Sequence, residues 1–185
     1  SGNHGWVHSC AWSPDGSRLL LTATSGTTPL AYLIPRLGGD ARLLPVTSLV
    51  SDIAVFGAWL PDGERVTLWP RNQRDGPTRI AEINTRTGDT STSSVGEFAH
   101  SMQGSWSPTA SRLVLSHVGD DAQEVWIHRT KGPSVPLYAT AFPDSILASP
   151  QWSSAGDAVL ALRGLTDLVR IPLGRDGVTA AGPVQ

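Results

Sequence analysis

A chain of 185 residues with a formal net charge of −2 is long enough for one globular domain with a substantial buried core. All but one of its 14 basic residues are arginine, and they form no run of the kind that binds nucleic acid or an anionic membrane surface. The single cysteine, Cys10, excludes an intramolecular disulfide, and no apolar run approaches the roughly 20 residues that cross a bilayer, so we expect no membrane insertion by this chain.

The first 46 residues predict a four-stranded antiparallel unit. Its strand-length segments are 7–13, 18–24, 29–35 and 41–45. The first two flank the turn Ser13-Pro14-Asp15-Gly16, in which proline presets φ, aspartate tolerates the third position and glycine accepts a positive φ at the exit. The leucine-rich second segment is too apolar for a strand with one solvated face, so we expect this unit to be covered on both faces.

The same pattern returns three times along the chain. The tryptophans that head the copies are spaced by 46 or 47 residues, and they are Trp12, Trp59, Trp106 and Trp152. Helix-length segments with apolar residues at 3.6-residue spacing are absent from the sequence. We therefore predict an all-β fold, a single β-propeller domain of four-stranded antiparallel blades, with the four blades at about 7–46, 54–94, 102–139 and 147–182. The fourth strand of the last blade is expected within 178–182, after the turn at residues 175–177.

The four copies resemble the W-S-P-D-G repeat of TolB-type, or WD-like, β-propellers. Residues 12–16 match the repeat throughout, Leu60 replaces its serine in the second copy, and Thr109-Ala110 replaces Asp-Gly in the third. The family includes periplasmic partner-binding propellers, propeller parts of prolyl-oligopeptidase-like enzymes, and sensor domains of bacterial membrane proteins. The resemblance implies the fold and an extracytoplasmic location, on the periplasmic or secreted side, but a fold shared so widely does not choose the function.

The number of blades leaves two alternatives open. Four blades form a closed ring by themselves, or they are part of the six- to eight-bladed rings that are usual among relatives of this repeat. The first alternative predicts a monomer. The second leaves apolar blade faces exposed and predicts a homodimer, because monomers rarely expose large apolar patches.

The sequence contains none of the common catalytic or nucleotide-binding motifs. G-x-S-x-G, H-E-x-x-H, C-x-x-C and G-x-x-x-x-G-K are all absent. His4 and His8 share one face of a strand but lie about 13 Å apart, too far to bind one zinc ion. We therefore expect no catalytic residues, no metal and no cofactor.

Loops are the usual binding elements of a rigid β-scaffold, and one end of the blades collects the charged candidates. From the loops between second and third strands come Trp69, Arg71, Arg74, His117, Asp120 and Asp121, and from the connections between blades come Asp52, His100 and Asp144. The arginine forks of Arg71 and Arg74 are typical of contacts with an acidic partner. The connecting residues, together with His4, line the channel mouth if they converge, although aspartate before a strand is usually a turn or cap residue.

The tryptophans divide into core and contact candidates. The four repeat tryptophans and Trp126 are expected to pack in the core, whereas Trp69 beside Arg71 is a candidate for a partner contact. The sequence therefore favours a non-catalytic module that binds a protein or peptide. The alternatives are part of the gating propeller of a prolyl-oligopeptidase-like peptidase and a propeller that senses a sugar or a metal ion.

Overall fold

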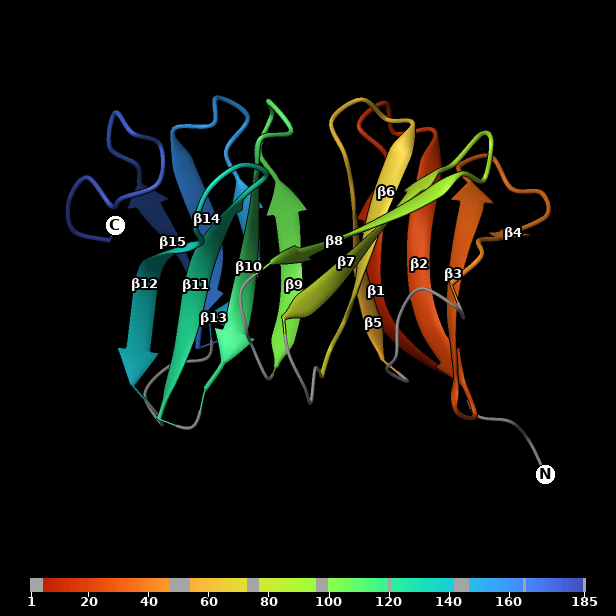
Figure 1. Cartoon of the computed structure of the whole chain (residues 1–185), viewed down its shortest axis with the longest axis horizontal. Helices are drawn as coiled ribbons and strands as arrows, with labels where there is room; N and C mark the ends of the chain where they lie inside the picture. The colour runs from red at the N-terminus through yellow and green to blue at the C-terminus, as the bar shows by residue number, and fades with distance from the viewer. Residues whose placement is uncertain are drawn as a thin grey trace. The chain divides into compact units, whose positions relative to one another are not determined.

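The chain folds as antiparallel β-sheets in a computed structural model that describes residues 5–46, 54–72, 77–95, 100–119, 121–141, 147–164 and 166–184 (Figure 1). Its strands are β1 (Gly5–Trp12), β2 (Arg18–Ser25), β3 (Thr28–Pro35), β4 (Arg42–Leu43), β5 (Val55–Trp59), β6 (Arg65–Pro70), β7 (Thr78–Asn84), β8 (Thr90–Val95), β9 (Ser101–Trp106), β10 (Arg112–Val118), β11 (Ala122–Arg129), β12 (Val135–Ala141), β13 (Leu147–Trp152), β14 (Ala158–Arg163) and β15 (Asp167–Pro172). Among these residues no helix is long and apolar enough to cross a membrane.

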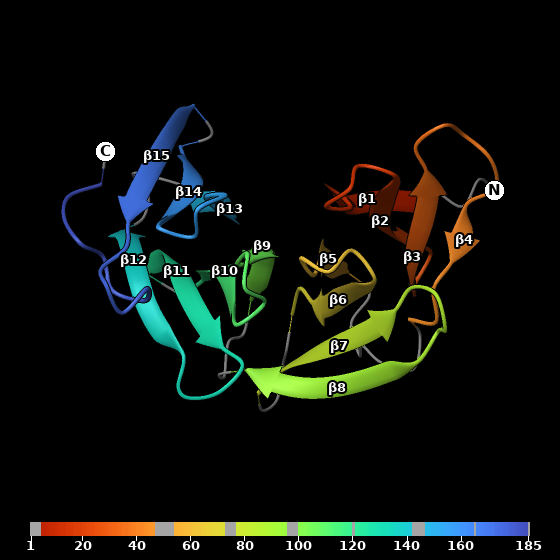
Figure 2. The ribbon, with the colours of Figure 1, turned by 90° about the horizontal axis from the view of Figure 1, so that it is seen from above.

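Two compact units divide the chain, Ser1–Glu97 and Phe98–Gln185. The first unit contains two sheets with the strand orders β1-β2-β3-β4 and β5-β6-β7-β8. Figure 2 shows β5 to β8 in chain order, with β7 and β8 side by side. Consecutive strands pair throughout because each is joined to the next by a short turn, as the repeat pattern predicts.

The core of the first unit lies between its two sheets. Leu20 and Leu33 of the first sheet share one apolar cluster with Val66, Leu68 and Ile83 of the second, and each of these side chains is at most 4% exposed. This packing explains the dense apolar segments of the sequence, since the strands that carry them are covered by the neighbouring sheet.

The second unit repeats this arrangement with the strand orders β12-β11-β10-β9 and β13-β14-β15. Val114 and Ile127 of the first of these sheets pack in one cluster with Val159 and Ile171 of the other. The all-β, four-bladed organisation predicted from the repeat is therefore confirmed, with four strands in three sheets and three in the last.

The predicted fourth strand of the last blade, within 178–182, is wrong. After β15 the chain turns at Gly174 and Gly177 and makes only one bridge back, between Leu173 and Ala180. The Asp176 carboxylate accepts hydrogen bonds from the backbone N–H groups of Val178 and Thr179, so it stabilises a tight loop in place of an extended strand. The fourth strand of the first blade is also shorter than the predicted 41–45, since β4 has two residues.

The hairpin turn of the repeat forms as its sequence predicts. Gly16 donates its N–H to the Ser13 carbonyl at 2.8 Å and has a φ of 66°. Asp15 accepts hydrogen bonds from the Ser13 hydroxyl and from the backbone and hydroxyl of Ser17, which lower the pKa of its carboxyl to about 2. In the third copy Ala110 takes the left-handed conformation of the replaced glycine, with a φ of 56°.

Of the four repeat tryptophans, two are buried, one is half-buried and one is exposed. Trp59 and Trp152 are 6% and 9% exposed, as expected for core residues, and Trp106 is half-buried. The core prediction is wrong for Trp12, which is 57% exposed. Its strand, β1, begins the first sheet, and within its own unit no described sheet precedes it.

Candidate functional site

Trp69, the predicted contact residue, is part of the core. Its side chain is 0% exposed, and it pairs in register with Phe56 across β5 and β6. A partner therefore has no access to this indole in the folded unit. The interpretation of Trp69 as a surface contact is wrong because β6 is buried from its second residue to its last.

His117 is also buried, and it belongs to a chain of hydrogen bonds inside the third sheet. Its Nδ1 lies 3.1 Å from the Ser101 hydroxyl, and its Nε2 lies 3.0 Å from the Nε2 of His128. The series of hydrogen bonds continues from the Nδ1 of His128 to the Ser134 hydroxyl, at 2.7 Å. Burial lowers the pKa of His117 to about 3, with a smaller contribution from His128, and lowers the pKa of His128 to about 4, so both imidazoles are neutral near pH 7.

The other predicted loop residues are exposed or lie outside the described part of the chain. Arg71, His100 and Asp121 are exposed. The His100 carbonyl accepts the backbone N–H of Val118. Outside the described residues lie the remaining candidates, which are His4, Asp52, Arg74, Asp120 and Asp144. Among the residues that are described, no three His, Cys, Asp or Glu side chains come close enough to hold a metal ion.

Charged side chains converge at the opposite end of the sheets. We call this end of the sheets the turn end. In each unit, the turn end contains two connections from every sheet: the hairpin turn between its first and second strands, and the connection that follows its third strand. Figure 1 shows the β5–β6 and β7–β8 turns at the same, upper end of the second sheet. Antiparallel pairing brings these turns together, because alternate connections of a meander lie at the same end.

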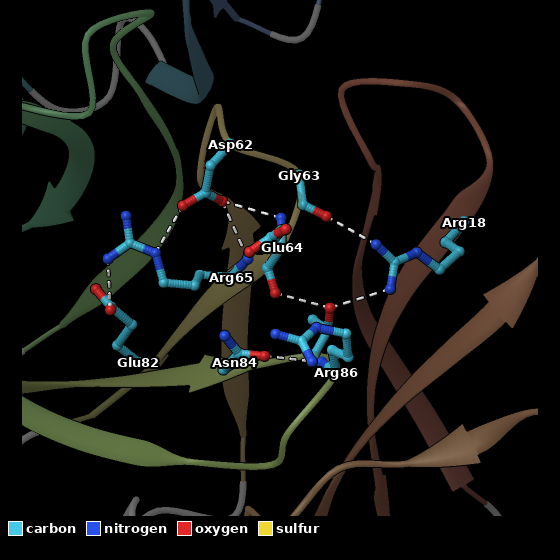
Figure 3. Close-up of polar contacts among 9 residues, drawn as sticks. Arg18, Asp62, Gly63, Glu64, Arg65, Glu82, Asn84 and Arg86 are labelled. Atoms are coloured by element: carbon cyan, nitrogen blue, oxygen red, sulfur yellow. Dashed lines mark hydrogen bonds and ion pairs between the residues drawn. The ribbon is translucent and has the colours of Figure 1, made fainter.

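At the turn end of the first unit, Arg18 bridges the two sheets. Its guanidinium lies over the Trp59 ring, 4.9 Å from the centroid, and donates a hydrogen bond to the Thr85 hydroxyl at 3.0 Å. It also donates a hydrogen bond to the Gly63 carbonyl at 2.7 Å (Figure 3). In return the Trp59 indole N–H donates to the Ala11 carbonyl at 3.0 Å. The two sheets are therefore joined by polar contacts in addition to their apolar core.

Arg65, at the equivalent position of the second copy, forms ion pairs within its own sheet. Its Nε lies 2.6 Å from Asp62 and its NH1 2.8 Å from Glu82 (Figure 3). Desolvation raises the pKa of the Asp62 carboxyl. Hydrogen bonds from the Arg65 side chain and from the backbone outweigh desolvation, so the pKa is lowered overall. Both Arg65 and its partners are partly exposed, so these pairs contribute little to stability.

The second unit repeats the bridge with Arg112. Its guanidinium lies 4.8 Å from the centroid of the Trp152 ring and donates a hydrogen bond to the Gly177 carbonyl. The indole Nε1 of Trp152 is buried and has no hydrogen-bond partner among the described residues. Gly177 has a φ of 66°, and a Cβ added there would displace the Arg112 guanidinium from its present position.

A pocket opens beside each bridging arginine. In the first unit its volume is about 450 Å³, and three arginines share it with two carboxylates; these charged residues are Arg18, Arg42, Arg86, Asp40 and Glu64. In the second unit the pocket has a volume of about 580 Å³ and holds four cations with one carboxylate, namely Arg112, Arg129, Lys131, Arg175 and Asp176. The two pockets occupy equivalent places but differ in charge.

The sequence prediction placed binding at the other end of the blades and missed these residues. A repeat signal was available for the bridging arginines, since Arg18, Arg65 and Arg112 each lie six residues after a repeat tryptophan. Ala158 takes this position in the fourth copy. No comparable spacing marks Arg129 and Lys131, and Arg175 joins them only when two sheets pack.

No protein-family model matches the chain, and the curated proteins contain no match. Solved structures do match: TolB from Acinetobacter baumannii, with 19% identity over 89% of this chain and 40% of that chain, has a TM-score of 0.65. A putative TolB from Agrobacterium tumefaciens has 18% identity over 97% of this chain and 79% of that chain, with a TM-score of 0.61. The chain therefore spans less than half of the Acinetobacter protein and about four fifths of the Agrobacterium protein.

A third similar structure is an auxiliary nutrient binding protein from Bacteroides thetaiotaomicron. It has 13% identity over 97% of this chain and 42% of that chain, with a TM-score of 0.67. Similarities at such low identity show the fold alone. The resemblance to TolB-type β-propellers that the repeat indicates is confirmed at that level.

Proposed function

We propose that this β-propeller chain is a non-catalytic binding module that recognises a protein or peptide partner at the turn end of its sheets. The observation that carries the proposal is the pocket beside Arg112, about 580 Å³ in volume and lined by charged side chains from both sheets of its unit. Pockets between rigid elements, with a few polar groups at fixed positions, are the usual form of a binding site.

The described chemistry favours binding over catalysis. The imidazoles of His117 and His128 are at most 3% exposed and bond to each other, so a substrate has no access to the most perturbed titratable groups of the unit. The pocket contains guanidinium groups and an ammonium, which attract anions but are poor nucleophiles and bases, together with the Ser111 and Thr130 hydroxyls. Its one carboxylate, Asp176, accepts three hydrogen bonds within its own loop.

The resemblance to TolB-type propellers supports an extracytoplasmic location, which we include in the proposal. The chain spans only part of the Acinetobacter TolB chain. The test of location is the complete reading frame that contains this sequence, fused to a reporter that is active only outside the cytoplasm. Reporter activity supports the proposal, and activity restricted to cytoplasmic reporters contradicts it.

A random peptide library displayed on phage tests the function. The immobilised chain should enrich peptides that bind in solution with micromolar dissociation constants and are recovered uncleaved, as mass spectrometry checks. Cleavage of the bound peptides would instead indicate a hydrolase. Thermal stabilisation by calcium, zinc or simple sugars, without any peptide binding, would favour the sensing alternative; saturation at 100 times the dissociation constant stabilises a protein by about 2.7 kcal/mol.

A further inference from the structure

The pocket of the second unit has an unbalanced positive charge. Its lining holds four cations and one carboxylate, whereas the whole chain has a net charge of −2. In the described part of the chain the salt bridges belong to Arg65, Arg163 and Arg170, and none involves a cation of this pocket. The pocket therefore concentrates positive charge that the described protein does not neutralise.

The one carboxylate in the pocket is already engaged in its own loop. Asp176 accepts the backbone N–H groups of Val178 and Thr179 through Oδ1, at 3.0 and 3.1 Å, and the Thr179 hydroxyl through Oδ2 at 2.7 Å. These hydrogen bonds lower the pKa of the Asp176 carboxyl, and the one from the Val178 N–H has the largest effect. The charge of Arg129 also lowers this pKa, by the smallest amount. Arg129 thus lies near Asp176 without forming a salt bridge to it.

Two of the cations are held in place before any ligand arrives. Arg112 lies over Trp152 and donates to the Gly177 carbonyl, and the Nε of Arg129 donates to the Pro133 carbonyl at 3.2 Å. Lys131 and Arg175 are exposed on the neighbouring loops. Preorganised guanidinium groups lose little entropy on binding and favour planar anions, which they bind with two parallel hydrogen bonds.

The pocket of the first unit provides a natural comparison. It has the same bridging arginine, but Asp40 and Glu64 offset two of its three positive charges. The equivalent place in the fold therefore does not require a positive charge. The excess in the second unit comes from Arg129, Lys131 and Arg175.

We infer that the pocket lined by Arg112, Arg129, Lys131 and Arg175 binds an acidic segment of the partner through its carboxylates, an inference that rests on the proposed function. The local excess of three positive charges matches two or three carboxylates. Nucleic acid and anionic membranes fit less well, because they require a basic surface broader than one pocket on a chain of negative net charge.

Fluorescence anisotropy with a labelled hexaglutamate peptide tests the inference, and hexaglutamine is the neutral reference. The test variant is Arg129→Gln with Arg175→Gln, which leaves the Arg112 bridge intact. The matched control is Arg42→Gln with Arg86→Gln, which removes the same charge from the first pocket. Circular dichroism and thermal unfolding establish that both variants fold.

The wild type should bind hexaglutamate and not hexaglutamine, more weakly as salt rises. The test variant should lose roughly tenfold in affinity, since two partly exposed charge contacts together contribute about 1.4 kcal/mol, and the control should change less than twofold. Equal losses in both variants would overturn the inference, as would equal binding of the neutral peptide.

Three further outcomes show whether the inference alone or the proposed function as well is wrong. If inorganic phosphate binds and hexaglutamate does not, the pocket takes a small anion and the inference is wrong. If the phage library yields only neutral or basic peptides that bind the test variant as well as the wild type, the proposed function stands and the acidic segment is excluded. If no peptide binds at all, both fail.

Discussion

The guanidinium of Arg18 lies over the indole of Trp59, 4.9 Å from its centroid, and connects the second strand of one sheet to the first strand of the next. Arg112 and Trp152 have the same relationship at 4.8 Å. Each arginine begins the second strand of its sheet and each tryptophan ends the first strand of the following one. The contact is thus repeated along the chain, and among the described residues of each unit it joins the two sheets.

Replacing Arg18 by alanine should destabilise the first unit by about 2 kcal/mol, because the variant loses a cation–π contact and two hydrogen bonds to the second sheet. Urea unfolding at pH 7 measures the change. Arg36→Ala, an exposed arginine of the same sheet, is the control and should cost less than about 0.5 kcal/mol. Equal costs for the two variants would show that the bridge adds nothing to stability.

The same tryptophan position should differ greatly in importance between copies. Trp59→Ala should cost about 3 to 5 kcal/mol, because it removes a large buried ring and leaves a cavity. Trp12→Ala should cost less than about 1 kcal/mol, since that ring is 57% exposed. Chemical denaturation of the two variants compares them directly, and a large cost at Trp12 would mean that another surface covers β1 in solution.

Acid should destabilise the second unit through its buried histidine pair. The pKa values of His117 and His128 are lowered from 6.5 to about 3 and about 4, so the unfolded chain binds more protons than the native one below pH 6.5. Stability is therefore complete above this pH and falls as the pH drops toward 4, by up to about 1.4 kcal/mol per pH unit for each histidine.

Urea unfolding of the wild type between pH 7 and pH 4.5 measures this slope. His128→Gln, which keeps a polar side chain without a titrating group, should reduce the slope by about half. A slope unchanged in this variant would assign the acid sensitivity to other groups.

The charge balance of the first pocket should control its binding. Asp40→Asn with Glu64→Gln leaves three arginines without a carboxylate there, the same excess as in the second pocket. Isothermal titration with hexaglutamate should then give two sites per chain in place of one. A stoichiometry that remains at one would show that position and shape, as well as net charge, select the ligand.

The strands and their turns were predictable because they depend on neighbouring residues. Pro14, Asp15 and Gly16 act through φ preferences and hydrogen bonds within one turn, and the repeat of that turn indicated the number of sheets. The strand that was predicted within 178–182 but does not form also has a local explanation. Gly174, Asp176 and Gly177 form a tight loop there through hydrogen bonds between neighbouring residues.

Burial and the candidate site were decided by the tertiary structure. A polar neighbour such as Arg71 suggested that Trp69 was accessible, but the packing of the second sheet leaves it 0% exposed. Local alternation of residues does not report which sheet lies against a strand.

The sequence by itself thus determined the fold class, the repeat and the turn geometry, since each rests on interactions between residues close in the chain. Only the tertiary structure decided where charge gathers. Arg112 and Arg129 belong to one sheet and Arg175 to the loop that follows the last strand of the other, and they line one pocket because the apolar faces of the two sheets pack together. Burial of apolar surface drives that packing, and the charged side chains at the edge of the core are positioned as its consequence.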